Sequence, residues 1–569
     1  MPCAACATGA EALAAPRFSV VTPVYETPAD VLEAMLASVR RQGCEDWELC
    51  LVDDASQQAH VGEILARAAA SDPRIRVQRR ERNGGIVAAS NDALAMAGGE
   101  FIALLDHDDT LHPDALALVA EAIAANPEVD YVYTDEDKLD PSGLHLGPFF
   151  KPDWSPERLR TQMYTCHLSV MRRSLVAEVG GFDADFEGSQ DWDLVLKVSE
   201  RARAVAHIPR VLYHWRMLET STAGGGEAAK PWAFEAGTRA IQAHCERIGL
   251  QAQAERDLDH PGVYHLRPAL SAEPLVSIVI PTAAQRREVR YEDVVLVCHC
   301  VRSIVASSTY ANYEIVCVYD ADTPVEALEE LAEIAGERLR LVRYDDPFNF
   351  SAKINLGAEH SRGEHLLLLN DDMEVVEPDW LQRLVMYSQL PGVGAVGGRL
   401  ILQDGRLQHV GIIFPDGLPG HAHYGFPAAF SGYSNNVLVA QNYLAVTGAC
   451  LMTPRADFER LGGLDPAFPM NYNDMDYCLK VRADGQRVVY DPDTVLFHFE
   501  SSSRSTEVED WEKERFLERW LPLTAVDPAS NPHLDHGLPK LSGALAWVRR
   551  RPRVGQRLRQ LARRGNGSG

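Results

Sequence analysis

Short apolar segments alternate with amphipathic segments along the beginning of the chain. The apolar segments are rich in β-branched residues, as strands buried on both faces of a sheet are; they are 18–24, 47–53, 75–79 and 101–105. The segments between them repeat apolar residues at helical spacing; they are 29–41, 59–69 and 84–97. This alternation predicts an α/β fold with right-handed crossovers and a mostly parallel sheet.

The chain repeats five sequence blocks in the same order. The blocks at 18–23, 47–54, 99–108, 180–183 and 191–194 return as 276–281, 313–320, 363–372, 462–465 and 474–477. A period of roughly 260–285 residues is too long for a solenoid repeat and indicates a duplicated domain.

We therefore expect two tandem α/β domains. The expected parts are an N-terminal arm at 1–16, a first domain at 17–250, a linker at 251–273, a second domain at 274–525 and a basic tail at 526–569. Pro261 and Pro268 lie within the linker, and Pro274 follows it directly.

Acidic residues stand where the predicted strands end. They are Asp53, Asp54, Asp106, Asp108 and Asp109. Ligands of open parallel sheets bind at the carboxyl ends of the strands, and gathered carboxylates favour Mg²⁺ or Mn²⁺ with phosphate oxygens. A single Asp at a strand end also caps the following helix. The clustering, echoed by Asn370, Asp371 and Asp372 in the second half, favours a site for metal and diphosphate.

A second acidic block, Asp-x-Asp, begins at Asp191 and again at Asp474. Each precedes an apolar stretch, so both residues are expected at helix N-termini, where they act either as caps or as general bases that deprotonate a hydroxyl. A histidine follows each block after 23 or 24 residues, namely His214 and His498. Their matched spacing favours a third metal ligand in each half.

These residues resemble those of family 2 glycosyltransferases with the GT-A fold, and the resemblance covers 18–216 and 276–504. It implies two tandem GT-A domains, Rossmann-like with mostly parallel sheets. It also implies inverting transfer of a sugar from a nucleoside diphosphate to a hydroxyl, with Mn²⁺ or Mg²⁺ as cofactor. The implied roles are nucleotide-sugar binding by Pro23, Tyr25, Asp54 and Asp106, metal binding by Asp108 and His214, and base catalysis by Asp191.

The second half resembles bacterial rhamnosyltransferases and O-antigen transferases, including its segment 498–504. The implied residues there are Pro281, Asp320 and Asp371 for the nucleotide sugar, Asp372 and His498 for the metal, and Asp474 as base. It departs from the first half where Asn370 replaces Asp106 and Ala283 replaces Tyr25.

These departures leave three interpretations open. The chain is a bifunctional transferase that builds a bacterial surface glycan from UDP-, dTDP- or GDP-linked sugars on a glycan or lipid-linked acceptor. Alternatively, one half is an inactive carbohydrate-binding scaffold. A nucleotidyltransferase also places nucleotide and metal on an α/β sheet, but the Gly-rich basic loop usual near its start is missing from this sequence.

We expect substrate specificity to reside in the loops at 135–165 and 403–445. The second loop carries His409, His421 and His423 in a stretch rich in Gly and Pro. These histidines either bind a metal or belong to the acceptor side of the site.

Composition and charge limit the class of protein and the partners that it can bind. The chain has 569 residues, of which 46% are hydrophobic and 24% charged, which is ordinary for a globular protein. A net charge of −26 argues against nucleic acid as a partner. Eight arginines and no acid lie between Arg549 and Arg564, which makes the tail either a solvated end or a contact to anionic lipid.

The expected location is the cytoplasm, peripheral to the inner face of the membrane. The N-terminus lacks the basic region of a signal peptide. Eleven cysteines, an odd number, suggest free thiols in a reducing compartment.

Overall fold

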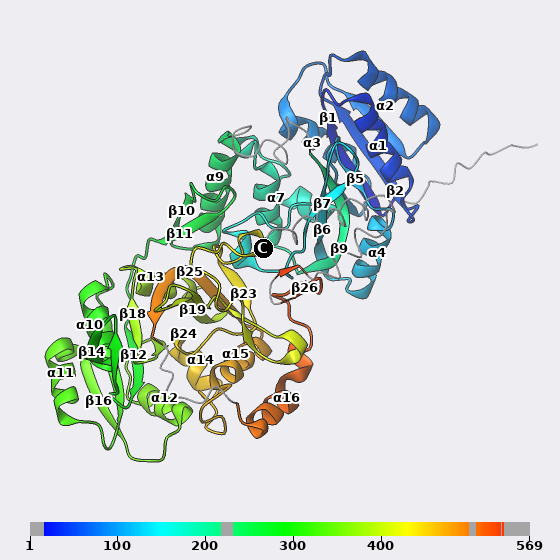
Figure 1. The fold of residues 1–569 in the computed structure, drawn as a ribbon. Helices are drawn as coiled ribbons and strands as arrows, with labels where there is room; N and C mark the ends of the chain where they lie inside the picture. Colours follow the sequence, from blue (N-terminus) through cyan, green and yellow to red (C-terminus); the bar gives the residue numbers. More distant parts are fainter. Residues whose placement is uncertain (1–15, 218–230, 500–507, 536–537, 540–569) are drawn as a thin grey trace, which may run out of the picture. The chain divides into compact units, whose positions relative to one another are not determined.

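Four parallel strands form one side of the first sheet in the computed structural model, which describes residues 16–217, 231–499, 508–535 and 538–539 (Figure 1). Their bounds are β1 Phe18–Val24, β2 Trp47–Asp53, β3 Ile75–Arg79 and β4 Phe101–Leu104. β1 pairs with both β2 and β4, and β2 pairs with β3. β2 is buried at every position because its residues pack on both faces of the sheet, as its continuous apolar run predicts.

The sheet continues beyond β4 with strands of mixed direction. These are β5 Thr110–Leu111, β6 Val129–Leu139, β7 His145–Phe149, β8 Ser169–Arg172 and β9 Ala204–Arg216. The order is β3-β2-β1-β4-β8-β6-β9-β5, with β7 paired to β6. β8 runs antiparallel to β4 and β6, whereas β6 and β9 are parallel.

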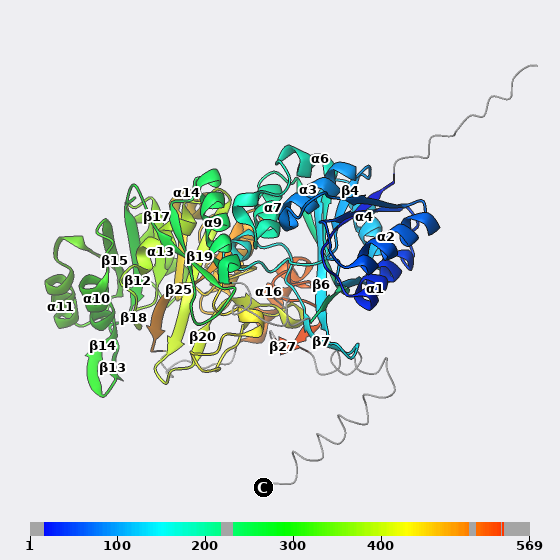
Figure 2. The ribbon, with the colours of Figure 1, turned by 90° about the horizontal axis from the view of Figure 1, so that it is seen from above.

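Helices cover both faces of this sheet (Figure 2). They are α1 Ala29–Arg40, α2 Ala59–Ser71, α3 Gly85–Met96, α4 Ala115–Ala125, α6 Arg173–Glu178, η1 Ala184–Phe186 and α7 Gln190–Ser199. α9 Pro231–Ile248 follows them in the chain, and its residues from Ile241 on belong to the second unit. α1, α2 and α4 share one core with β1 and β2, in which Leu32, Leu65 and Val119 are buried. α3 also packs on β1 and β2, but its residues are not part of that core.

The second sheet repeats the strand order of the first and has one additional strand. Its order is β16-β15-β12-β17-β24-β19-β25-β18, with β20 paired to β19 and β23 to β25. The bounds are β12 Val276–Thr282, β15 Tyr313–Asp320, β16 Leu339–Tyr344, β17 His365–Leu369, β18 Met373–Val375, β19 Val393–Leu402, β20 Leu407–His409, β23 Gln441–Tyr443, β24 Cys450–Pro454 and β25 Arg487–His498. The shared order confirms the α/β fold class and agrees with a duplicated domain.

The helices of the second half occupy corresponding places along the chain. They are α10 Leu296–Ser307, α11 Val325–Ala335, η2 Gly336–Arg338, α12 Phe350–Glu359, α13 Trp380–Ser388, η3 Pro415–Gly417, η4 Tyr433–Asn435, α14 Arg455–Arg460, α15 Asn473–Ala483 and α16 Asp510–Thr524. Four short strand pairs complete it: β10 Ala252–Arg256 with β11 Tyr264–Pro268, β13 Arg286–Val289 with β14 Glu292–Val295, β21 Ile412–Ile413 with β22 Gly420–His421, and β26 Leu534–Asp535 with β27 Leu538–Pro539.

The chain divides into two compact units, and one segment from the first half of the sequence belongs to the second unit. The first holds the described residues up to Phe149 and those of Thr165–Ala240, and the second holds Phe150–Tyr164 and the residues from Ile241 onward. The segment Phe150–Tyr164, which carries α5 Pro156–Leu159, thus packs with the second unit although it precedes β8 in the chain. The expected domains, 17–250 and 274–525, do not include this placement of residues 150–164, and their boundaries stay a prediction.

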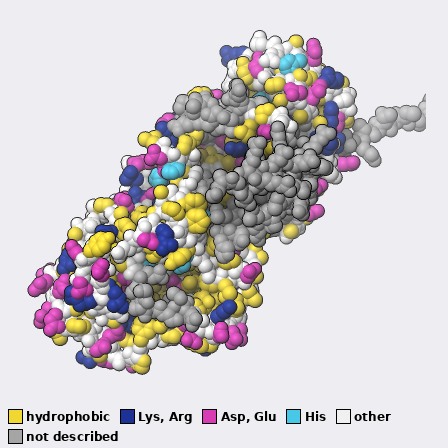
Figure 3. Space-filling view, in the orientation of Figure 1, with side chains coloured by type: hydrophobic (Ala, Val, Ile, Leu, Met, Phe, Trp, Pro, Cys, Tyr) yellow, Lys and Arg dark blue, Asp and Glu magenta, His cyan; other side chains and the backbone are white. Residues whose placement is uncertain are grey.

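Acidic and basic side chains are interspersed over the described face that Figure 3 shows. None of the described helices is long and apolar enough to cross a membrane. The N-terminal arm, except its last residue, and the arginine-rich part of the tail lie outside the described residues.

Candidate active site

The strand ends of the first unit meet as the acidic pattern predicts. β1 lies between β2 and β4, so the ends of all three strands share one edge of the sheet. Asp54, one residue beyond β2, accepts hydrogen bonds from the backbone N–H groups of Gly84 and Gly85, each at 2.9 Å. Arg80 Nε lies 3.1 Å from the same carboxylate. Asp54 thereby holds the start of α3 against the site, and Tyr25 beyond β1 is exposed.

The turn after β4 forms the densest acidic cluster. Asp106, Asp109 and His167 each bring one potential metal ligand within 4.8 Å of the other two. Burial, with the charges of Asp108 and Asp106 adding to it, raises the pKa of Asp109 well above its usual range. Burial also raises the pKa of Asp108. Carboxylates that repel one another in this way are a fitting set of ligands for a divalent cation.

Tyr213 and Trp215 hold the imidazole of this cluster. The ring of His167 stacks on Tyr213 at 4.5 Å between centroids and meets Trp215 edge-on at 5.7 Å. Tyr213 donates its hydroxyl to Asp109 Oδ2 at 2.6 Å. The sequence repeat gives no signal for His167, because its counterpart in the second half is Ala449. This correspondence follows from the pairing of β8 with β4 and of β24 with β17.

His214 does not lie with this cluster. Tyr213 and Trp215 face His167, so His214 between them points to the other face of β9. There its Nδ1 lies 2.7 Å from Asp137 Oδ1. The structure groups His214 with Asp137 and His145 rather than with Asp106 and Asp109.

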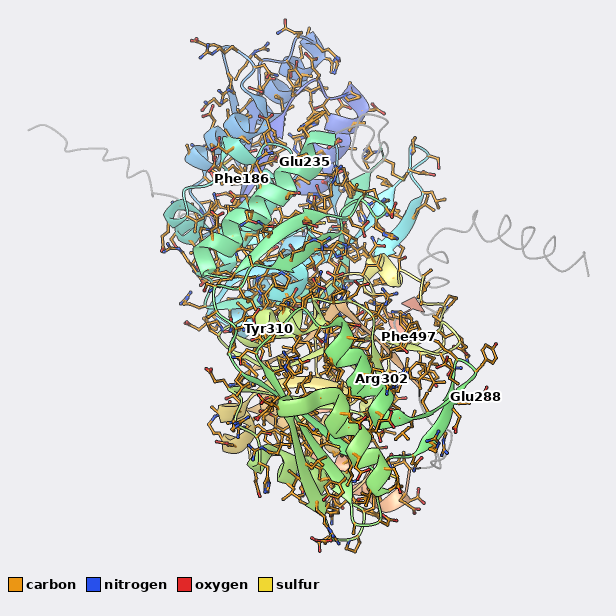
Figure 4. The ribbon with its side chains drawn as sticks, turned by 90° about the vertical axis from the view of Figure 1, so that its left-hand side faces the viewer. Phe186, Glu235, Glu288, Arg302, Tyr310 and Phe497 are labelled. Atoms are coloured by element: carbon orange, nitrogen blue, oxygen red, sulfur yellow. The ribbon has the colours of Figure 1, made fainter. Side chains whose placement is uncertain are left out.

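His498 takes the opposite orientation in the second unit. Phe497, labelled in Figure 4, lies under the Arg290 guanidinium at 4.8 Å, which leaves His498 on the other face of β25. His498 Nε2 is 3.1 Å from Asp372 Oδ1 and 3.4 Å from Asn370 Nδ2.

Register explains why the two histidines differ. β5 pairs His214 with Thr110, four residues after Asp106, whereas β18 pairs His498 with Met373, three residues after Asn370. A shift of one residue along a strand turns a side chain to the opposite face.

The acids at the strand ends of the second unit have different hydrogen-bond and ion-pair partners from those of the first unit. Asp371 Oδ2 accepts a hydrogen bond from Thr282 Oγ1 at 2.5 Å, beside the buried Pro281 of β12. Asp320 Oδ1 lies 2.8 Å from Lys353 Nζ, and this lysine also donates to the Thr282 carbonyl at 2.9 Å. Lys353 is only 2% exposed. A buried ammonium thus neutralises the acid expected at the nucleotide base, a partner that the sequence analysis did not identify.

The two Asp-x-Asp blocks begin equivalent helices, and their two acids have different surroundings. The second acids are ion-paired: Asp193 Oδ2 with Lys197 Nζ at 2.7 Å and Asp476 Oδ2 with Lys480 Nζ at 3.0 Å. Both lysines donate in addition to a backbone carbonyl, of Gly181 or Gly463. These pairs fix the helix starts.

The first acids of the blocks are the candidate bases. Burial raises the pKa of Asp191, which interacts electrostatically with His167 and Asp106. Burial also raises the pKa of Asp474, although the Gly448 N–H donates to its Oδ2 at 2.7 Å. A carboxylate with a raised pKa is a better proton acceptor than an ordinary Asp.

Two of the three loop histidines form a pair. His409 Nδ1 lies 2.9 Å from His421 Nδ1, and the N–H of Thr447 points to His409 Nε2 at 3.4 Å. Burial lowers the pKa of His409 well below its usual range and that of His421 to about 4, so both rings are neutral near pH 7. His423 instead contacts Asn436 at 3.1 Å.

Comparison with known sequences decides the family. The sequence model of the family described as "Glycosyl transferase family 2" matches residues 19–180 and 277–461. The chain belongs to this family. Family membership decides against a nucleotidyltransferase.

Relatives of this family 2 glycosyltransferase include longer proteins. An uncharacterized protein, y4gI of Sinorhizobium fredii, is 42% identical over 91% of this chain and 58% of its own length. The O-antigen biosynthesis protein RfbC of Myxococcus xanthus is 38% identical over 95% of this chain and 42% of its own length. The chain therefore spans about half the length of these relatives.

Two further matches are partial. A chondroitin synthase of Pasteurella multocida is 30% identical over 35% of this chain and 20% of its own length. Among solved structures, TarS of S. aureus matches with a TM-score of 0.33 and 20% identity, over 40% of this chain and 65% of the solved one.

Proposed function

We propose that each unit transfers a sugar from a nucleoside-diphosphate donor to a hydroxyl of a growing bacterial surface glycan, with inversion. One observation carries the proposal: in both units a half-buried aspartate with a raised pKa, Asp191 or Asp474, stands in the first turn of the equivalent helix. The names of RfbC and chondroitin synthase support a glycan acceptor, either free or lipid-linked.

The donor binds at the strand ends in this proposal. Tyr25, Pro23 and Asp54 contact the nucleotide of a UDP-, dTDP- or GDP-linked sugar in the first unit, and Pro281 and Asp320 do so in the second. Asp320 pairs with the ammonium of the buried Lys353, whereas Asp54 of the first unit pairs with the guanidinium of Arg80, so the two pockets select different donors.

A Mn²⁺ or Mg²⁺ ion fits the acidic turn of the first unit, because Asp106, Asp109 and His167 converge and Asp108 lies among them. In the second unit Asp371, Asp372 and His498 would hold it. When bound, the cation neutralises the departing diphosphate. Asp191 and Asp474 then remove the proton from the attacking hydroxyl, each in its own unit.

A second candidate is one active unit beside a carbohydrate-binding one. Both groups of three converging metal ligands among the described residues lie in the first unit. Asn370, a neutral amide, stands in the second unit where the first has Asp106. These observations favour the second unit as the silent one.

The cellular location of the reaction is part of the same proposal. The reaction takes place at the inner face of the cytoplasmic membrane, with the arginine-rich tail on anionic lipid. The charge contrast between tail and body supports it.

Asp191→Asn and Asp474→Asn in the full chain test the division of labour. With a membrane extract as acceptor and a panel of nucleotide sugars, each variant is expected to lose one linkage by about 10²–10⁴-fold in rate, since that is what a positioned base contributes. Donor binding is expected to persist.

Asp114→Asn and Asp379→Asn serve as controls, because these carboxylates also stand at helix N-termini, of α4 and α13. Both controls should retain both linkages. An effect of Asp191→Asn alone selects the one-active-unit candidate, and full activity of both base variants contradicts the whole proposal.

A further inference from the structure

Two histidines of the first unit converge on one buried carboxylate outside the acidic turn. Asp137 Oδ1 lies 2.7 Å from His214 Nδ1, and Asp137 Oδ2 lies 3.0 Å from His145 Nδ1. One ligand atom from each of the three residues lies within 4.8 Å of the other two. The sugar-transfer chemistry proposed above does not use this group.

Three neighbouring strands supply the three side chains. β6 carries Asp137 and pairs with β7, which begins at His145, on one side and with β9 on the other. Asp137 and His214 are direct partners in the β6–β9 register. Ligands on paired strands are held more precisely than ligands on loops, so the group is preorganised.

The charge of the group suits a cation. Asp137 is 1% exposed, and each of its two carboxylate oxygens faces an imidazole nitrogen, of His214 or of His145. The His145 side chain is 31% exposed, which gives a cation access from solvent.

We propose that Asp137, His145 and His214 form a second cation site, separate from the acidic turn, for Zn²⁺ or a similar transition-metal dication. Two imidazoles and one carboxylate are the ligand set that Zn²⁺, Co²⁺ and Fe²⁺ prefer, whereas Mg²⁺ prefers oxygen alone. Three protein ligands leave a fourth position open. A bound ion fixes β7 to the sheet at its first residue.

Metal titration of the full chain tests the site. The metal-free His167→Ala protein, whose acidic turn then offers carboxylates alone, is given Co²⁺ in excess Mg²⁺, which competes for carboxylates but poorly for imidazole. We expect about one equivalent of Co²⁺ with visible absorption bands, displaced by Zn²⁺. His145→Gln and Asp137→Asn should weaken Co²⁺ binding by at least about tenfold, as even outer-shell partners of a metal contribute 10–100-fold.

Two variants control the assignment. His260→Gln alters a similar carboxylate with two histidines: Asp257 Oδ2 lies 3.1 Å from His260 and 3.2 Å from His265, yet this trio is not a convergent group among the described residues. Asp108→Ala removes an acid of the turn after β4. Both should keep the Co²⁺ bands.

Three results would overturn the proposal. They are the absence of Co²⁺ binding in excess Mg²⁺, equal binding by His145→Gln, and loss of binding in Asp108→Ala. The first result would mean that the trio is hydrogen-bonded only.

Discussion

A single imidazole in the second unit is held between two carboxylates. His265 Nδ1 lies 3.0 Å from Asp493 Oδ2, and its Nε2 lies 3.2 Å from Asp257 Oδ2. Burial would lower the pKa of His265, but these two hydrogen bonds outweigh burial and raise the pKa to about 9. The ring is therefore charged at neutral pH.

This charge makes the stability of the second unit depend on pH. Because the folded pKa exceeds the unfolded value of 6.5, the contribution is complete below pH 6.5 and disappears as the pH rises through 9. Denaturant titrations should show the free energy of unfolding falling by roughly 1–3 kcal/mol over that window. His265→Gln should remove this fall, and His360→Gln, which alters an exposed ring, should not; an unchanged slope in His265→Gln would contradict the assignment.

At the scale of elements, strand register decides which histidine approaches the acids after β4 and after β17. β25 turns His498 toward Asp372, whereas β9 turns His214 away from the acidic turn and His167 takes its place. The spacings from Asp191 to His214 and from Asp474 to His498 differ by one residue. Because side chains of a strand alternate between its two faces, a difference of one residue places a side chain on the opposite face.

We therefore expect different histidines to govern the metal response of the two units. His167→Ala should raise the Mg²⁺ concentration for half-maximal transfer by the first unit about tenfold, and His498→Ala should do so for the second. His214→Ala should have a much smaller effect on the first unit. Mg²⁺ titrations of each linkage measure this, and a tenfold effect of His214→Ala would show that β9 presents the other face to the donor.

At the scale of the whole molecule, a segment from the first half of the sequence belongs to the core of the second unit. Glu157 of α5 is fully buried, with its Oε1 3.1 Å from both Arg160 Nη1 and Arg487 Nε. Ser155 Oγ donates to Asn442 Oδ1 at 2.9 Å. The second unit therefore needs residues that lie more than 200 positions upstream of β23.

Glu157→Gln should destabilise the second unit by about 3 kcal/mol, because it leaves the buried guanidinium of Arg160 and the half-buried one of Arg487 without their carboxylate. The free energy of unfolding from denaturant titration of the full chain measures this. Asp345→Asn, which removes an exposed pair with Arg343, should cost less than about 1 kcal/mol. Equal losses in the two variants would mean that the segment contributes little to this unit.

The sequence by itself determined the α/β fold, the repeat and the acidic strand ends. Apolar runs such as 47–53 and acids such as Asp106 are local signals. Because the same signals occur in both halves, each half supports the prediction made from the other. The strands at 18–24, 47–53 and 75–79 have the bounds that the pattern predicts. Asp191 and Asp474 begin helices, as expected, within one residue of the predicted start.

Only the tertiary structure decided which side chains meet. His167, Lys353 and the trio around Asp137 depend on contacts between strands and helices far apart in the chain, and no local pattern encodes such contacts. The face that His214 presents depends on register across β5 and β9, which a spacing of residues along one strand does not fix. The placement of segment 150–164 depends likewise on packing against β23 and β25, since burial of Glu157 requires an arginine that lies 330 positions away.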